Sequence, residues 1–240
     1  MEVANNTILV VDDEVSLVEI IVHTLLSSGY QVLEAFSGEE AFEKVQDSAN
    51  DISLILSDVK MPGMGGAGLI KALREHNYEI PVILLTGYSN LKPDDAFASC
   101  VGRILKKPFE SEDLIEYVNE LLLPVEQRWT KSPQQSPHVK LYQFSKDKIS
   151  EIRFGREGFF LPISSPFPIV GETIAFELDT PDGKVEGLGE VVWARHMKAD
   201  RLSGVGVWID TLTESSVPIY KNLISNVAFH LKIPKGEEAA

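Results

Sequence analysis

The stretch ILSDVKMPGMGG, residues 55–66, joins an apolar strand to a loop through one carboxylate, that of Asp58. Pro62 and three glycines follow within the next eight residues. Glycine lets a backbone bend sharply and approach a ligand closely. A buried strand that ends in a carboxylate and continues into such a loop is typical of a binding site at the end of a sheet. The nature of this site depends on the residues that end the neighbouring strands.

The first half of the chain alternates short apolar runs with amphipathic segments. Strands are predicted at residues 7–11, 31–36, 52–57, 81–86 and 102–107. Helical spacing and capping residues predict helices over residues 16–29, 37–47 and 111–123. Alternating strands and helices, with uniformly apolar strands, indicate a parallel sheet covered by helices on both faces. We therefore expect a doubly wound α/β fold with five parallel strands.

Polar residues follow or end these predicted strands. They are Asp12 and Asp13 after the first strand, Asp58 after the third, Thr86 at the end of the fourth, and Lys106 and Lys107 at the end of the fifth. Ligands of open parallel sheets bind at the carboxyl ends of the strands, so we expect these side chains to share one cleft. Clustered carboxylates repel one another unless a cation lies among them, and their hard oxygens suit magnesium, Mg²⁺. An aspartate with a metal, a lysine and a hydroxyl nearby can accept a phosphoryl group.

The sequences VVDDE, LSDVKMPGMGG, ILLTGY and LKKPF carry a family resemblance. With these motifs in order, residues 1–123 resemble a response-regulator receiver domain. The resemblance implies a flavodoxin-like fold and transfer of phosphate from a histidine kinase or phosphotransfer protein. It also implies a phosphoacceptor signalling protein rather than an enzyme.

The same resemblance assigns a role to each residue of the cleft. It implies phosphorylation of Asp58, Mg²⁺ held by Asp12, Asp13, Asp58 and the main-chain carbonyl of Lys60, a switch hydroxyl on Thr86 and a phosphate-binding ammonium on Lys107. One position departs from the family pattern. Ile104 stands where these domains usually have Tyr or Phe, and its neighbour Arg103 is not aromatic either.

The second half has a different pattern. Residues 124–137, rich in Pro, Gln and Ser, are predicted to be a linker, and residues 138–240 a separate β domain. Strands are predicted at residues 148–154, 158–163, 172–179, 184–196 and 204–210, and a helix at residues 215–233. Antiparallel strands with one packed helix favour a small closed all-β barrel of five or six strands. The apolar stripe of the helix is interpreted either as a lid on the barrel or as a dimer face.

The stretches GFFLPISSPFPIVGETIAFEL, GLGEVVWARH and GVGVWID resemble the core strands of a PilZ domain. That family is best known for binding cyclic di-GMP through an arginine pair and a (D/N)xSxxG turn. Here no RxxxR segment precedes the barrel, Arg153 takes the Asp/Asn position and Gly155 the serine position. Two hypotheses follow: a degenerate barrel that acts by protein contact or dimerisation, or a cyclic di-GMP receptor that uses Arg153 and Arg156.

Composition excludes several classes of protein. The net charge is −14, and neither half shows a basic face for a phosphate backbone, so DNA is not an expected partner. The single cysteine, Cys100, rules out an internal disulfide and fits a reducing compartment. No apolar stretch is long enough to span a membrane, and the N-terminus has no secretory pattern. We therefore expect a soluble, cytoplasmic protein with an unknown downstream protein partner.

Overall fold

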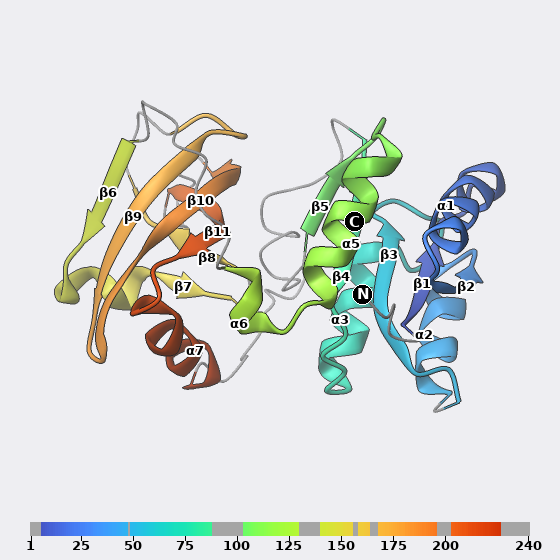
Figure 1. Ribbon diagram of the computed structural model, residues 1–240, viewed down its shortest axis with the longest axis horizontal. Coiled ribbons are helices and arrows are strands. Elements are labelled where there is room, and N and C mark those ends of the chain that lie inside the picture. Colours follow the sequence, from blue (N-terminus) through green and yellow to red (C-terminus); the bar gives the residue numbers. More distant parts are fainter. Residues whose placement is uncertain are drawn as a thin grey trace, which may run out of the picture. The chain divides into compact units, whose positions relative to one another are not determined.

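The chain divides into two compact units, Met1–Arg128 and Trp129–Ala240. The computed structural model describes residues 6–47, 49–87, 103–129, 140–155, 158–163, 168–195 and 203–226 (Figure 1). Each unit has a sheet of its own. Within the described ranges, no helix is long and apolar enough to cross a membrane.

The first unit contains five parallel strands in the order β2-β1-β3-β4-β5. The strands are β1 Thr7–Val11, β2 Gln31–Ala35, β3 Ile52–Asp58, β4 Val82–Thr86 and β5 Arg103–Lys106. This is the order of flavodoxin-like folds, in which the strand order reverses beside β1. The predicted five-stranded parallel sheet is confirmed.

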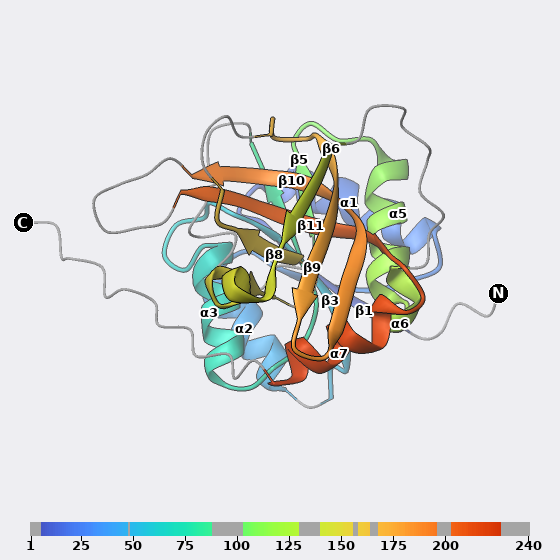
Figure 2. The same cartoon turned by 90° about the vertical axis from the view of Figure 1, so that its left-hand side faces the viewer.

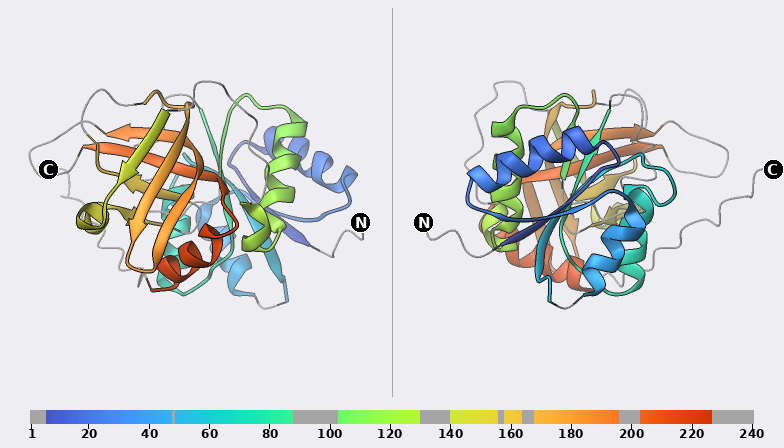
Figure 3. Two further views of the ribbon diagram at one scale, coloured as in Figure 1. Left: turned by 60° about the vertical axis from the view of Figure 1, so that its left-hand side comes forward. Right: turned by 90° about the vertical axis from the view of Figure 1, so that its right-hand side faces the viewer.

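Helices cover both faces of this sheet (Figure 3). They are α1 Val15–Ser27, α2 Gly38–Gln46, α3 Gly66–Glu75 and α5 Ser111–Leu122. Ile8 and Val10 of β1 pack in the core with α1 and α5, whereas Leu9 and Val11 pack in the core with α2 and α3. This alternation follows from the two-residue period of a strand, and it explains why a strand buried on both faces is uniformly apolar.

The predicted helix over residues 37–47 is confirmed as α2. Two hydrogen bonds between side chains and backbone amides hold its first turn. The amide of Glu40 donates to Oγ of Ser37 at 3.1 Å, and Oε2 of Glu40 accepts from the amide of Phe36 at 2.9 Å. The first bond satisfies an amide that the helix leaves without a partner, and the second differs from a capping box because Glu40 accepts from Phe36, the residue before the cap, and not from Ser37.

The predicted linker, residues 124–137, is described only as far as residue 129. A short helix, α6, spans Val125–Arg128. The guanidinium of Arg128 donates to the carbonyl of Leu121 at 2.6 Å, which caps the end of α5. Trp129 begins the second unit, where its carbonyl accepts from the amide of Leu212 at 2.9 Å. Arg128 is thus bonded within the first unit and Trp129 within the second.

The second unit contains a six-stranded sheet in the order β6-β9-β10-β11-β8-β7 (Figure 2). The strands are β6 Lys140–Phe144, β7 Arg153–Phe154, β8 Gly158–Leu161, β9 Thr173–Thr180, β10 Gly183–Arg195 and β11 Gly204–Leu212. The predicted strands over residues 158–163, 172–179, 184–196 and 204–210 correspond to β8, β9, β10 and β11. Among the described strands the order ends at β6 and β7, between which no pairing occurs, so the sheet they form is not closed.

Two predictions for this unit were wrong. Residues 148–154 were predicted as one strand, but Lys146–Glu151 form a 3₁₀ helix, η1, and only Arg153–Phe154 pair as β7. The strands were also expected to be wholly antiparallel, yet β6 runs parallel to β9. The physical reason is topological. The chain between β6 and β9 passes through η1, β7 and β8, and so long a connection can return in the original direction.

The helix predicted at residues 215–233 is described as α7, Ser216–Asn226, and residues 227–233 of the prediction lie outside the described residues. It packs against β10, and Tyr220 at its centre is fully buried. The Tyr220 hydroxyl lies 2.7 Å from the carbonyl oxygen of Gly155 and 2.9 Å from that of Gly158. These contacts fit the interpretation of α7 as a lid on its own sheet. The alternative of a dimer face stays a prediction.

Candidate functional site

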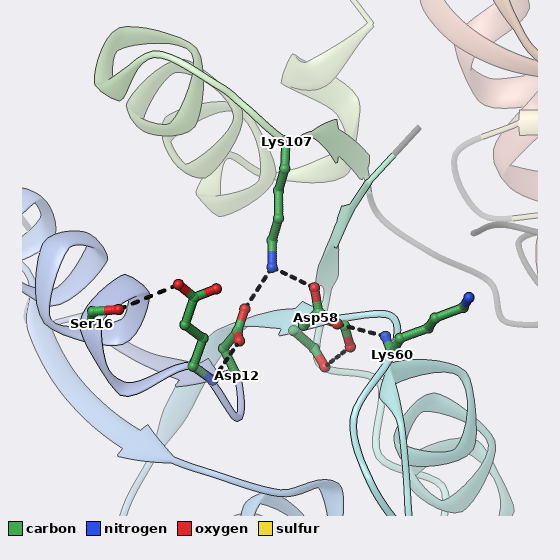
Figure 4. A network of polar contacts seen from close by, with 7 residues as sticks. Asp12, Ser16, Asp58, Lys60 and Lys107 are labelled. Atoms are coloured by element: carbon green, nitrogen blue, oxygen red, sulfur yellow. Dashed lines mark hydrogen bonds and ion pairs between the residues drawn. The ribbon is translucent and has the colours of Figure 1, made fainter. Parts of the chain in front are cut away.

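Four predicted site residues lie at the carboxyl edge of the first sheet. Asp12 directly follows β1, Asp58 and Thr86 end β3 and β4, and Lys107 directly follows β5. Asp58 and Thr86 are buried, and Asp12 is only 1% exposed. The fold therefore brings Asp12, Asp58 and Lys107 into one polar network, as the positions of the strand ends predict (Figure 4).

The ammonium of Lys107 lies between two carboxylates. Its Nζ donates to Oδ2 of Asp12 at 2.8 Å and to Oδ1 of Asp58 at 2.5 Å (Figure 4). Burial by itself would lower the pKa of Lys107, but the hydrogen bonds and charges of Asp12 and Asp58 outweigh it. The pKa of Lys107 is therefore raised above its ordinary value of 10.5. At neutral pH the site holds a fixed positive charge against the Asp58 carboxylate.

The remaining oxygens of the two acids accept from backbone amides. Oδ2 of Asp58 accepts from the amide of Lys60 at 2.6 Å, and Oδ1 of Asp12 accepts from the amide of Glu14 at 2.9 Å. Both carboxylates are thus held at fixed angles by their own loops. The Lys60 side chain is exposed and points away from Asp12 and Asp58 (Figure 4). The main-chain amide of Lys60 therefore contacts Asp58, whereas a role of the Lys60 carbonyl in holding Mg²⁺ stays a prediction.

Within the described residues, Asp13 does not join the hydrogen-bond network of Asp12 and Asp58. Its side chain is exposed and makes no hydrogen bond or ion pair within the described part of the chain. The same described residues hold no group of three or more His, Cys, Asp and Glu arranged to bind a metal ion. Asp12 and Asp58 nevertheless offer the hard oxygen donors that Mg²⁺ prefers, and the Lys107 ammonium shows that a cation is stable between them. The donor set therefore fits Mg²⁺.

Thr86 ends β4, and Ile104 is the second residue of the neighbouring β5. The Thr86 hydroxyl donates to the carbonyl of Gly87 at 3.0 Å, and the Thr86 carbonyl accepts from the amide of Lys107 at 2.7 Å. The second bond ties the position of Lys107 to the end of β4. Ile104 is partly buried against the core of α2 and α3, so the position that is usually aromatic in receiver domains is here a core residue.

Two structural contacts of the first unit were not predicted from the sequence. Arg103 of β5 binds Glu120 of α5 at 2.5 Å, and Glu39 of α2 binds the amide of Met64 at 2.9 Å. Glu120 lies off the apolar stripe of its predicted helix, so that stripe does not indicate the first contact. The second joins α2 to a loop residue 25 positions further along the chain, and no local pattern indicates it.

The predicted nucleotide-binding arginines of the second unit are only partly described. Arg153 lies on β7 with an exposed side chain, and Arg156 lies outside the described residues. The turn after β7 is closed by a hydrogen bond of 2.7 Å from the amide of Gly155 to the carbonyl of Gly158. The use of this arginine pair for cyclic di-GMP stays a prediction.

Comparison with known proteins agrees with the geometry of the first unit. Residues 8–119 match the family model of the response regulator receiver domain. The chain is 35% identical over 124 residues to the alkaline phosphatase synthesis transcriptional regulatory protein PhoP of Bacillus subtilis, covering 49% of each protein. It is 32% identical over 151 residues to the response regulator SaeR of Staphylococcus aureus, covering 62% of this chain and 61% of SaeR.

Two further similarities cover about half of the chain. The sensor kinase CckA of Brucella abortus is 36% identical over 121 residues, which are 48% of this chain and 12% of CckA. The receiver domain of the Francisella response regulator 1452 matches 49% of this chain and 97% of its own at 31% identity, with a TM-score of 0.46. The chain thus spans less than two thirds of the length of each of the three curated relatives. Residues 8–119 of this chain are a response regulator receiver domain.

Proposed function

We propose that this protein is a two-component response regulator whose Asp58 accepts a phosphoryl group from a histidine kinase or phosphotransfer protein. The observation that carries the proposal is the double restraint on Asp58. Lys107 holds Oδ1 and the amide of Lys60 holds Oδ2, at the end of a buried strand in a receiver domain. A carboxylate oriented in this way is prepared for attack on phosphorus.

In the proposed transfer, one oxygen of Asp58 forms a bond to phosphorus and the bond from phosphorus to the imidazole nitrogen of the donor breaks. The leaving imidazole keeps the electron pair of that bond. The Lys107 ammonium lies on the Asp58 carboxylate at 2.5 Å and can move to the incoming phosphoryl oxygens, whose negative charge it neutralises. We assign Thr86 as the switch hydroxyl. Its present partner is the carbonyl of Gly87, an exchangeable hydrogen bond beside the site.

We further propose that Asp12, Asp13, Asp58 and the main-chain carbonyl of Lys60 hold Mg²⁺. When bound, the ion supplies positive charge that stabilises the transferring phosphoryl group. Asp13 would enter the metal shell from its exposed position, where no residue in the described ranges holds its carboxylate by a hydrogen bond.

Labelling with radioactive acetyl phosphate in the presence of Mg²⁺ tests the proposal. We expect wild-type protein to be labelled and Asp58→Asn to take up no label, because the amide has no nucleophilic carboxylate oxygen. Asp47→Ala is the control, since Asp47 is an exposed aspartate that follows α2 and whose side chain accepts from the amide of Ala49. Undiminished labelling of Asp58→Asn would refute the proposal.

For the second unit, we propose a PilZ-like output module that acts by contact with a downstream protein or by dimerisation. Support comes from the order of its predicted core strands and from the departures at Arg153 and Gly155 in the expected nucleotide-binding turn. The alternative is a cyclic di-GMP receptor that uses non-standard residues. Sedimentation with and without beryllofluoride, a phosphoryl mimic, tests output by dimerisation. We expect the sedimenting mass to increase when the mimic is added. If the mass does not change, dimerisation is refuted and contact with a downstream protein is the proposal that is kept.

A further inference from the structure

The loop that follows Asp58 is tied to the start of α2 by two hydrogen bonds. The amide of Met64 donates to Oε1 of Glu39 at 2.9 Å, and the amide of Gly38 donates to the carbonyl of Met64 at 3.1 Å. Both polar groups of the Met64 backbone are therefore held by adjacent residues of one helix. These residues lie in a segment that is remote from the loop in sequence.

We call these two hydrogen bonds the tether. The loop and the start of α2 pack closely against each other around it. A Cβ added to Gly38 would lie 2.2 Å from the carbonyl oxygen of Met64, so a larger residue there would displace the loop. Gly63 has a φ of +70°, and its Cβ would lie 2.7 Å from Oε1 of Glu39. The capping of α2 uses Ser37 and Glu40, which leaves the Glu39 carboxylate available for the loop.

The tethered loop also carries the amide that holds the phosphoacceptor. Its two ends are joined by a bond of 3.2 Å from the amide of Gly66 to the carbonyl of Val59. Within it, the amide of Lys60 donates to Oδ2 of Asp58 at 2.6 Å. Displacement of the loop at Met64 would therefore change the position of the Lys60 backbone, and with it the orientation of the Asp58 carboxylate.

We propose that Glu39 is a positioning residue for phosphorylation. Its carboxylate fixes the loop of residues 59–65 through Met64, and the loop fixes Asp58 through the amide of Lys60. The inference rests on the proposed role of Asp58 as the phosphoacceptor. Glu39 contacts no reacting atom and acts through the loop alone.

Three variants test this role. Glu39→Ala removes the acceptor, Glu39→Gln keeps an oxygen that can accept from Met64, and Glu43→Ala removes the same charge from an exposed position on the same helix. We expect labelling by acetyl phosphate to slow roughly fivefold in Glu39→Ala, the factor that one net hydrogen bond supplies. Glu39→Gln and Glu43→Ala should be labelled within about twofold of the wild-type rate.

Amide hydrogen exchange, followed by nuclear magnetic resonance without phosphoryl donor, gives the second readout. The amide of Met64 should exchange faster in Glu39→Ala than in the wild type, and Glu39→Gln should restore its protection. If the wild-type protein took up no label, the proposed function would be refuted. The exchange data would still show whether the Glu39 carboxylate holds the amide of Met64. The positioning role is refuted if Glu39→Ala is labelled, and its Met64 amide exchanges, at the same rates as in the wild type. It is also refuted if Glu39→Gln is labelled as slowly as Glu39→Ala, or if Glu43→Ala loses as much labelling rate as Glu39→Ala.

Discussion

Arg103 on β5 and Glu120 on α5 form an ion pair in which Nη2 and Oε1 lie 2.5 Å apart and the side chains are 10% and 6% exposed. The guanidinium carbon of Arg103 also lies 5.1 Å from the centre of the Tyr117 ring. Arg103 directly precedes Ile104, the position where receiver domains usually have an aromatic residue. A charged pair thus fixes the last strand of this sheet to the last long helix of the unit.

The first prediction follows from the burial of this pair. Glu120→Ala should lower the free energy of unfolding by about 3–5 kcal/mol, because it leaves the Arg103 charge buried without its carboxylate. The double variant Arg103→Met, Glu120→Leu should recover most of that loss. Urea unfolding followed by far-ultraviolet circular dichroism measures both. The control is Glu75→Ala, which removes an exposed partner of Lys71 at 3.9 Å and should cost less than about 1 kcal/mol. Equal losses in Glu75→Ala and Glu120→Ala would contradict this expectation.

The second prediction concerns competition between Lys107 and the metal. The Lys107 ammonium bonds to both Asp12 and Asp58, so a bound Mg²⁺ must share or replace these contacts and faces a like charge. We expect Lys107→Met to bind Mg²⁺ several-fold more tightly than the wild type in calorimetric titration. Lys71→Met, which removes an exposed lysine of α3, should bind as the wild type does. Weaker binding by Lys107→Met would show that the ammonium does not oppose the ion.

The third prediction is the pH dependence of the same contacts. Because Asp12 and Asp58 raise the pKa of Lys107, the folded state retains the proton to higher pH than the unfolded state. The stabilisation is fully present below the ordinary lysine pKa of 10.5 and is lost as pH rises through the raised folded value. The difference in stability between wild type and Lys107→Met should therefore be constant from pH 7 to pH 9 and shrink only above about 10.5. Urea unfolding at a series of pH values tests this, and a decline near neutrality would contradict it.

The fourth prediction is that free cyclic di-GMP does not bind the second unit. The arginine pair of the PilZ family is missing before β6, and Arg153 and Gly155 occupy the Asp/Asn and serine positions of the turn. A lysine cannot reproduce the planar contacts of arginine to phosphate and guanine. Calorimetric titration should give no binding heat at high ligand concentration. A micromolar dissociation constant for the unmodified protein would instead establish the receptor alternative.

The fifth prediction tests α7 as a lid on its sheet. Tyr220→Phe removes the hydroxyl that bonds to the carbonyls of Gly155 and Gly158, and should cost about 1 kcal/mol. All three tryptophans of the chain belong to the second unit, so tryptophan fluorescence follows the unfolding of that unit alone. Tyr142→Phe is the matched control. The buried Tyr142 hydroxyl has no hydrogen-bond partner within the described residues, so its removal should cost nothing. A larger loss in Tyr142→Phe than in Tyr220→Phe would contradict the assignment.

Much of the first unit could be predicted from the sequence because its signals are local. Uniformly apolar runs predict strands buried on both faces, and a residue that directly follows such a strand must lie at one edge of a parallel sheet. This reasoning placed Asp12, Asp58, Thr86 and Lys107 at the same edge, where the structure also has them. It also identified the cap at Ser37, whose partner Glu40 lies three residues away.

The contacts between distant segments were decided by the tertiary structure alone. Sequence patterns predict which side chains are buried, but they do not predict which polar atoms of distant loops and strands form hydrogen bonds. Three features depend on the conformations of loops that only the folded chain fixes. They are the position of the Lys107 ammonium between two acids, the exposure of Asp13 and the bond from Met64 to Glu39. The parallel pairing of β6 with β9 depends on the path of the intervening chain. Local periodicity therefore determined the elements and the edge that carries the site, whereas the packing of those elements determined the hydrogen bonds that orient Asp58.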